Sequence, residues 1–226
     1  MNALFFARHR RLIVKPVLRR LLAIGAIGLV GVAAVFLIDE EQVRSLSSQL
    51  PASLRFLPFV MNFLAIGEMT SRALFYHCDL SLLRYPFYRK GTFRHFCIRL
   101  YRMTGLNLLI GATLSMAVTI VATAAGGVPA TDLVLFWGCA MALSVFFSVH
   151  HLFMYYMFQP FTTDLNTKNP YYWFVNMAVS ALCGVFLFLP VPPVAFTVVV
   201  LALALVYTVA ALWLVFRFGS RTFRVR

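Results

Sequence analysis

The placement of the basic residues between long apolar runs constrains this chain more than any motif in it. Most of its 20 Lys and Arg residues fall into three groups. These groups are Arg8, Arg10, Arg11, Lys15, Arg19 and Arg20; Arg84, Arg89, Lys90, Arg94, Arg99 and Arg102; and Arg217, Arg221, Arg224 and Arg226. A bilayer core of about 30 Å needs about 20 apolar residues per helix, and Lys and Arg in short loops mark the cytoplasmic side. The pattern predicts an all-α polytopic membrane protein with both termini inside.

The composition agrees with that class. Hydrophobic residues make up 62% of the chain, which leaves no soluble domain of any size. A formal net charge of +13 would suggest nucleic acid in a soluble protein. Because the cations here flank apolar runs, we expect them to orient the chain and contact the lipid bilayer, and we expect no nucleic-acid partner.

Six transmembrane helices account for all the basic groups. We expect them at about 21–38, 56–77, 105–125, 131–157, 172–189 and 194–216. Residues 1–20 are basic with an apolar face, which favours an interfacial helix over a disordered basic tail. The predicted organisation is therefore an interfacial connecting helix at 1–20, a six-helix transmembrane domain at 21–216 and a basic cytoplasmic tail at 217–226.

The first predicted span carries small residues on one side. Gly25, Gly28 and Gly31 follow one another at three-residue spacing. Small residues at such spacing allow two helices to approach closely in a membrane. We expect this face to pack against a neighbouring helix.

The second predicted span contains two charges, Glu68 and Arg72. They are four residues apart, so they share one helical face and can pair. Charges inside a span are costly unless paired or wet, and they mark functional sites by default. We expect an intramembrane polar pair, either functional or structural, with the alternative that Arg72 reaches the cytoplasmic interface.

Residues 78–104 are predicted to form the main cytoplasmic loop. They combine six aromatic side chains with the second basic group. Aromatic residues and arginine are enriched in protein interfaces. The composition favours a docking surface over a membrane-surface loop without a partner.

The chain lacks the familiar catalytic motifs. It has no G-x-x-x-x-G-K-[ST], G-x-S-x-G or H-E-x-x-H sequence. His77, Cys78, His95 and Cys97 have irregular spacing for a zinc site, and we expect no bound metal. His150 and His151 are too few for a membrane di-iron enzyme, so we expect one to face a polar gap and the other a neighbouring helix. We expect no catalytic residue and no cofactor in this chain.

The order of these segments resembles the membrane (permease) subunit of a bacterial ABC-2-type exporter. The resemblance extends over the whole chain as architecture but is specific only over 77–103, where the stretch HCDLSLLRYPFYRK at 77–90 is similar to the corresponding segment of that family. It implies a connecting helix at 2–18 and a coupling region that contacts an ATPase. The coupling residues it implies are Leu83, Arg84, Tyr85, Pro86, Phe87, Tyr88 and Arg89. The segment LPVPPV at 189–194 is shorter than the outer re-entrant helices of that family.

The resemblance implies a function in transport and not an enzyme. Two membrane subunits, identical or related, would work with a separate P-loop ATPase subunit that holds ATP and Mg²⁺. They would move an amphipathic or hydrophobic substrate, such as a lipid-like molecule or peptide, out across the bacterial cytoplasmic (inner) membrane. The alternatives are a non-catalytic membrane scaffold or assembly factor and, with less support, a membrane enzyme acting on lipids.

Overall fold

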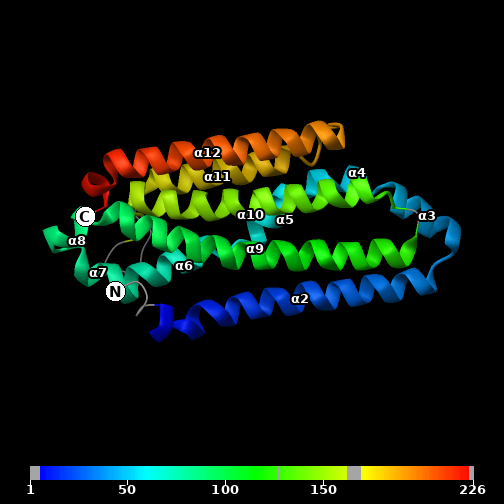
Figure 1. Ribbon diagram of the computed structural model, residues 1–226, viewed down its shortest axis with the longest axis horizontal. Coiled ribbons are helices and arrows are strands. Elements are labelled where there is room, and N and C mark those ends of the chain that lie inside the picture. Colours follow the sequence, from blue (N-terminus) through cyan, green and yellow to red (C-terminus); the bar gives the residue numbers. More distant parts are fainter. Residues whose placement is uncertain (1–5, 127, 162–168, 224–226) are drawn as a thin grey trace.

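The computed structural model describes residues 6–126, 128–161 and 169–223, and every regular element in these ranges is helical. Figure 1 shows the long helices lying side by side in an elongated bundle. In chain order, the elements are α2 (Arg10–Leu37), α3 (Glu40–Ser48), α4 (Leu50–Ser53), η1 (Leu54–Phe56), α5 (Leu57–Leu64), α6 (Gly67–Leu74), η2 (Phe75–Asp79), α7 (Leu80–Leu82), α8 (Pro86–Lys90), α9 (Thr92–Ala125), α10 (Ala130–Phe158), α11 (Pro170–Val185) and α12 (Pro193–Thr222). The predicted all-helical class is confirmed.

Five stretches of the described chain are long and apolar enough to cross a membrane. They are α2, the run from Leu50 to Leu82, α9, α10 and α12. The fifth predicted span, 172–189, corresponds to α11, which has 16 residues. At 1.5 Å per residue α11 is about 24 Å long, less than the bilayer core of about 30 Å. The chain has the character of a multi-pass membrane protein, and the described helices confirm five long apolar stretches but not the sixth predicted span.

Helix α10 forms the centre of the bundle. It packs along α9 on one side and α12 on the other, and it also contacts α5 and α6. Its side chains Cys139, Phe147 and Leu152 are fully buried. A helix that is apolar on every side suits a central position, because each face meets another helix.

The glycine face of α2 packs against α9, as the sequence predicts for two of its three glycines. A Cβ atom at Gly28 would lie 3.1 Å from the Ala117 Cβ, and one at Gly31 would lie 3.0 Å from Val121 Cγ2. Gly25 has no such neighbour within 4 Å. The close approach of α2 and α9 therefore depends on Gly28 and Gly31.

The boundary predicted at residue 20 is not a helix end. Helix α2 runs without interruption from Arg10 to Leu37, with Pro16 inside it. Pro16 removes one backbone N–H donor from the second turn, and the helix nevertheless continues through it. The connecting helix predicted at 2–18 is thus, from Arg10 onward, the first part of the same long helix; residues 1–5 lie outside the described ranges.

The predicted loop at 78–104 is also mostly helical. Its residues form the end of η2, the short helices α7 and α8, and the first three to four turns of α9, which begins at Thr92. The third span, predicted to begin at 105, is therefore one part of a 34-residue helix. The sequence predicts a loop because basic residues interrupt the apolar pattern there, yet helix α9 continues through Arg94, Arg99 and Arg102.

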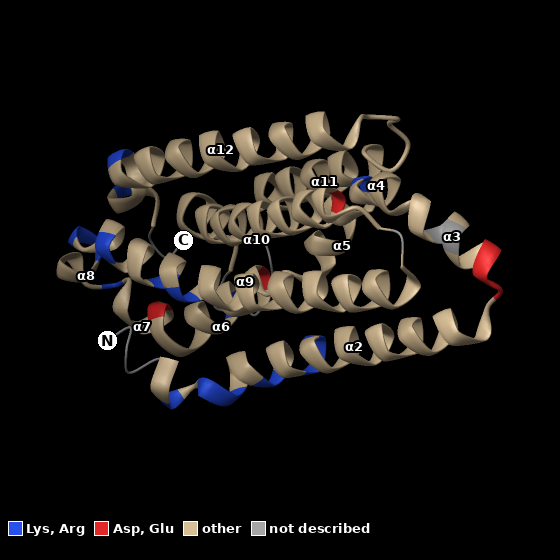
Figure 2. Ribbon diagram, turned by 45° about the vertical axis from the view of Figure 1, so that its right-hand side comes forward, with Lys and Arg blue, Asp and Glu red and all other residues tan. Residues whose placement is uncertain are grey.

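Charged residues separate toward the two ends of the bundle. Figure 2 shows Lys and Arg gathered where α2 begins, around α8, and where α12 ends. Acidic residues mark α3 at the opposite end, which begins with Glu40 and Glu41. We call these the basic end and the acidic end.

Candidate functional site

A buried carboxylate organises the basic end. Asp79 is the last residue of the π-helical turn η2, and its side chain is fully buried. A buried charge that lacks partners costs several kcal/mol. Here each carboxylate oxygen accepts two hydrogen bonds, which uses the four acceptor positions that a carboxylate offers. Asp79 is therefore a structural group with no free acceptor position for a ligand.

Arg99, on α9, supplies two of those hydrogen bonds. Its Nη1 donates to Asp79 Oδ2 at 2.6 Å and its Nη2 donates to Asp79 Oδ1 at 2.7 Å. Two parallel bonds between guanidinium and carboxylate form the strongest common type of ion pair, and both side chains are fully buried. The pair holds η2 against the N-terminal part of α9.

Three tyrosines complete this cluster. The Tyr88 hydroxyl donates to Asp79 Oδ1 at 2.7 Å, and the Tyr155 hydroxyl donates to Asp79 Oδ2 at 2.5 Å. Arg99 Nη1 also donates to the Tyr156 hydroxyl at 3.0 Å. Burial raises the pKa of Tyr88 well above its ordinary value, so its hydroxyl keeps the proton that it donates. The cluster joins η2, α8, α9 and α10.

The end of α12 is attached to the same cluster. Phe223 is fully buried and stacks on the Tyr156 ring, with ring centroids 4.3 Å apart. The Thr222 hydroxyl donates to the Tyr156 backbone carbonyl at 3.1 Å. Residues 217–222 of the predicted tail thus continue α12 and end on the tyrosine cluster.

The predicted coupling residues divide into buried anchors and an exposed surface. Leu83 and Tyr88 are buried, Arg89 is half-buried, and Arg84, Tyr85, Pro86 and Phe87 are exposed. Tyr85 and Phe87 are 53% and 62% exposed, and their ring centroids lie 5.6 Å apart. We call Arg84, Tyr85, Phe87 and Arg89 the α7–α8 surface. The Asp79–Arg99 cluster anchors this surface to the neighbouring helices through the hydroxyl of Tyr88.

A second polar site lies where the second predicted span is broken. Helix α5 ends at Leu64 and α6 begins at Gly67, with Ala65 in an extended conformation. The Ile66 amide donates to Asn107 Oδ1 at 3.1 Å, and Arg20 Nη2 donates to the Ala65 carbonyl at 3.4 Å. Side chains of α9 and α2 thus replace the backbone hydrogen bonds that the break removes. Backbone N–H and C=O groups inside a membrane need such partners because no water is present there.

Two close contacts hold the break against α9 and α10. Asn107 Nδ2 donates to Ser148 Oγ at 2.7 Å. Gly67 lies directly against the ring of His151, and a Cβ atom at this position would overlap that ring. Glycine is required at residue 67 because another side chain would push α6 away from α10.

Glu68 and Arg72 lie on one face of α6, as their spacing predicts, and both are exposed. They line a cavity of about 430 Å³ beside the break. The other lining residues come from α2, α5, α10 and α11, and include Arg20, Asn62, His150, His151 and Asn176. Such a polar cavity at a broken helix can accept a small polar or charged group, which is how discontinuous membrane helices commonly contribute to binding sites.

The two adjacent histidines both line this cavity, so the prediction that only one of them faces a polar gap is not met, although their contacts differ. His150 Nε2 and the Asn176 Oδ1 are 3.0 Å apart, and His150 Nδ1 and the Tyr207 hydroxyl are 2.9 Å apart. His151 packs against α6 at Gly67. In the described residues, no group of three or more His, Cys, Asp and Glu side chains is placed to hold a metal ion.

Sequence reasoning missed the ion pair between Asp79 and Arg99, as well as the role of Tyr155 and Tyr156. Twenty positions separate Asp79 from Arg99, and the short helices α7 and α8 lie between them. One signal was present: Asp79 is the one acidic residue within a strongly basic stretch, 77–102. A lone carboxylate among arginines is a candidate for a buried pair.

Comparison of the chain with protein-family models, with curated proteins and with solved structures finds no match.

Proposed function

We propose that this chain is the membrane subunit of an ATP-driven exporter that works with a separate P-loop ATPase. The observation that carries the proposal is the α7–α8 surface, which combines exposed aromatic and basic side chains with a buried, fully hydrogen-bonded support. A surface that transmits force must be both accessible and rigidly attached to the helices that it moves. The resemblance of residues 77–90 to the coupling segment of ABC-2-type permeases supports the same function.

The charge of the α7–α8 surface suits a protein partner. Arg84 makes no ion pair with a carboxylate within the described ranges and is exposed. Tyr85 and Phe87 next to it offer the aromatic anchors that protein interfaces favour. An ATPase subunit with an acidic, apolar-lined groove would be complementary to it.

The mechanism follows from the attachments of α8. Movement of α8 pulls on Tyr88, and Tyr88 is bonded to the Asp79–Arg99 pair. That pair joins η2 to α9, and Tyr155 carries the displacement to α10. Helix α6 directly precedes η2 in the chain. The same movement therefore reaches the broken helix and its cavity, where an amphipathic substrate would bind.

The topology that we propose has the basic end in the cytoplasm and both chain ends on that side, in the bacterial inner membrane. Charge bias supports this orientation. A second copy of the chain or a related subunit would complete the pathway, as the resemblance to ABC-2-type permeases implies.

Co-purification and ATPase coupling test this function. We would express the chain with its neighbouring genes, purify it and identify the proteins that accompany it. A P-loop ATPase at equal stoichiometry is expected, and its substrate-stimulated activity should be lost in the double variant Arg84→Glu/Arg89→Glu. The control is Arg8→Glu/Arg94→Glu, which reverses the same charge at exposed positions outside the α7–α8 surface.

The same surface would also suit a non-catalytic scaffold or assembly factor, since any docked protein could use exposed Tyr85 and Phe87. The experiment separates the two functions. A stable partner that lacks a nucleotide site, and whose binding is lost in the Arg84→Glu/Arg89→Glu variant, would favour the scaffold. Full stimulated ATPase activity in that variant would contradict the coupling role.

A further inference from the structure

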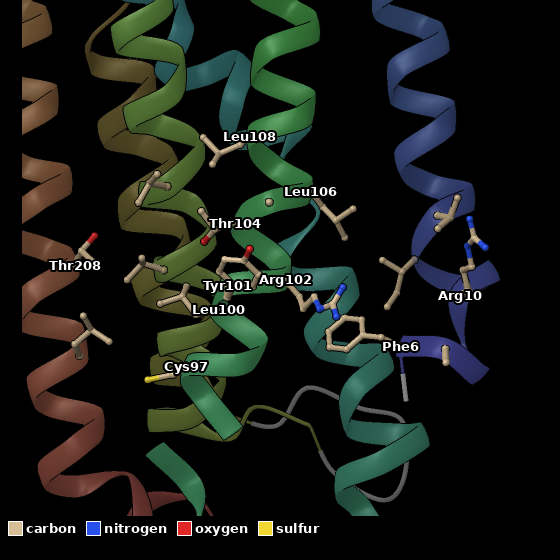
Figure 3. A pocket seen from close by; sticks show the side chains of 17 residues that line it. Phe6, Arg10, Cys97, Leu100, Tyr101, Arg102, Thr104, Leu106, Leu108 and Thr208 are labelled. Atoms are coloured by element: carbon tan, nitrogen blue, oxygen red, sulfur yellow. The ribbon is translucent and has the colours of Figure 1, made fainter. Parts of the chain in front are cut away.

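A long groove at the basic end lies outside both sites described above. Its volume is about 1030 Å³, and it is bounded by α2, α9, α10 and α12. Figure 3 shows its side chains between the lower turns of α2 and α9 and around α9 toward α12. Most of the lining is aliphatic, with Ile13, Leu106, Leu108, Val145 and Leu212 among its members.

Two arginines lie at the basic end of this groove. Arg10 comes from α2 and Arg102 from α9, and both are exposed. The contacts of Gly28 with Ala117 and of Gly31 with Val121 show that α2 and α9 run in the same direction. Continuing that alignment toward the basic end brings Arg10 to the level of the α9 turn that contains Arg102. Neither guanidinium forms an ion pair with a carboxylate in the part of the chain that the structure describes.

The lining changes from charged to apolar along the bundle axis. Leu108 is six residues beyond Arg102 on α9, which is about 9 Å farther toward the middle of the helix. Val145 of α10 also lines the apolar part. From the level of the two arginines toward the bundle centre the lining is apolar, the same order as headgroup and acyl chain of a phospholipid in one leaflet, while Cys97 and Leu100 line the groove nearer the bundle end.

We propose that this groove binds one anionic phospholipid of the leaflet at the basic end. Its phosphate is held between Arg10 and Arg102, because guanidinium groups bind phosphate oxygens through paired hydrogen bonds. One acyl chain passes Gly105 and lies along Leu108, Val145 and Leu212. The site requires no ATPase partner, so it stands independently of the proposed transport function.

Charge complementarity favours a lipid over a second copy of this chain. A second copy would need carboxylates near the two arginines, but the described residues include only six acidic side chains. Asp39, Glu40, Glu41 and Asp132 lie toward the acidic end, Glu68 lines the cavity at the broken helix, and Asp79 is buried in its own ion pair. Anionic headgroups are the abundant negative partner at this level of a membrane.

Native mass spectrometry of the full chain tests the proposal. The probe is an equimolar mixture of phosphatidylglycerol and phosphatidylcholine with identical acyl chains, added to the purified protein in mild detergent. We expect one retained phosphatidylglycerol per chain. In the variant Arg10→Gln/Arg102→Gln, its preference over phosphatidylcholine should fall by about tenfold, since each cation near a membrane surface contributes appreciably to anionic lipid binding.

A charge-matched variant and a groove-filling variant make the result decisive. Arg8→Gln/Arg94→Gln removes two exposed cations that do not line the groove, and the lipid preference should stay within about twofold of the original. Leu108→Trp fills the apolar part without changing charge, and the retained lipid should decrease for both headgroups. Equal loss in both double variants would overturn the proposal, because the cations would then act as a general surface. A lipid-free dimer that Leu108→Trp dissociates would overturn it in favour of a second copy.

Discussion

Two polar sites lie within this apolar bundle, and they differ in how deeply their charged groups are buried. At the basic end, Asp79 and Arg99 are fully buried and bonded to each other and to tyrosine hydroxyls. At the broken helix, Glu68 and Arg72 are exposed beside a cavity. A saturated cluster stabilises the fold, whereas charged groups that border a cavity remain accessible to a ligand. The comparison separates the structural charges of the chain from those available for binding.

The largest effect on stability is expected at the saturated site. Arg99→Met leaves the Asp79 carboxylate buried without its counter-ion, which should lower the free energy of unfolding by about 3–5 kcal/mol. The double variant Asp79→Leu/Arg99→Met removes both charges and should regain most of that loss. Denaturant unfolding in detergent measures both. Equal destabilisation by the single and double variants would show that charge burial is not the cause.

A hydroxyl of the same cluster should have a smaller effect. Tyr155→Phe removes a donor to Asp79 and should cost about 1.5–3 kcal/mol, the usual range for a hydrogen bond to a charged group. The matched control is Tyr101→Phe, since Tyr101 is 79% exposed and should lose almost nothing. Equal decreases in the melting temperatures of the two variants would show that the hydrogen bond from Tyr155 to Asp79 contributes no more to stability than an exposed hydroxyl.

Removing a hydrogen bond that supports the broken helix should destabilise the protein more than a change at the cavity charge and no more than Tyr155→Phe. Asn107→Leu removes the acceptor of the Ile66 amide and should destabilise the protein by about 1–3 kcal/mol. Hydrogen exchange should show the effect first at the amides of residues 65–68, with α12 unchanged. Uniform loss of protection over the bundle would contradict a local role for Asn107.

The smallest stability change is expected at the cavity charge. Glu68→Gln keeps the shape of an exposed side chain, so its unfolding free energy should change by less than about 0.5 kcal/mol. If the cavity receives the substrate, the concentration needed to stimulate the partner ATPase should shift severalfold in the same variant. A large loss of stability with unchanged ATPase stimulation would show that Glu68 is a structural charge and not a binding group.

Sequence reasoning located most of the long helices but not the places where helices break or continue. The predicted span 131–157 matches α10, Ala130–Phe158, because an uninterrupted apolar run determines both. The span predicted at 56–77 is broken at residues 65–66, where no Pro or charge marks the break. Asn107 and Arg20 provide its hydrogen bonds from distant positions, and no local pattern reports such partners.

The candidate sites follow the same division. The spacing of Glu68 and Arg72 correctly placed both on one face of a helix. The segment 83–89 was identified as a surface, yet Leu83 and Tyr88 within it are buried. Burial of Leu83 and Tyr88 depends on α10, because Tyr155 and Tyr156 of α10 approach this segment only in the folded chain.

The sequence by itself determined that this chain is helical, apolar and charged at one end, because composition and charge distribution act at every position regardless of distance. Only the tertiary structure decided which charges are buried and which are accessible. That depends on long-range partners: Arg99 reaches Asp79 from α9, and His151 fits against α6 because Gly67 has no side chain. Burial of a charge is favourable only where such partners meet, and meeting is a property of packing and not of local sequence.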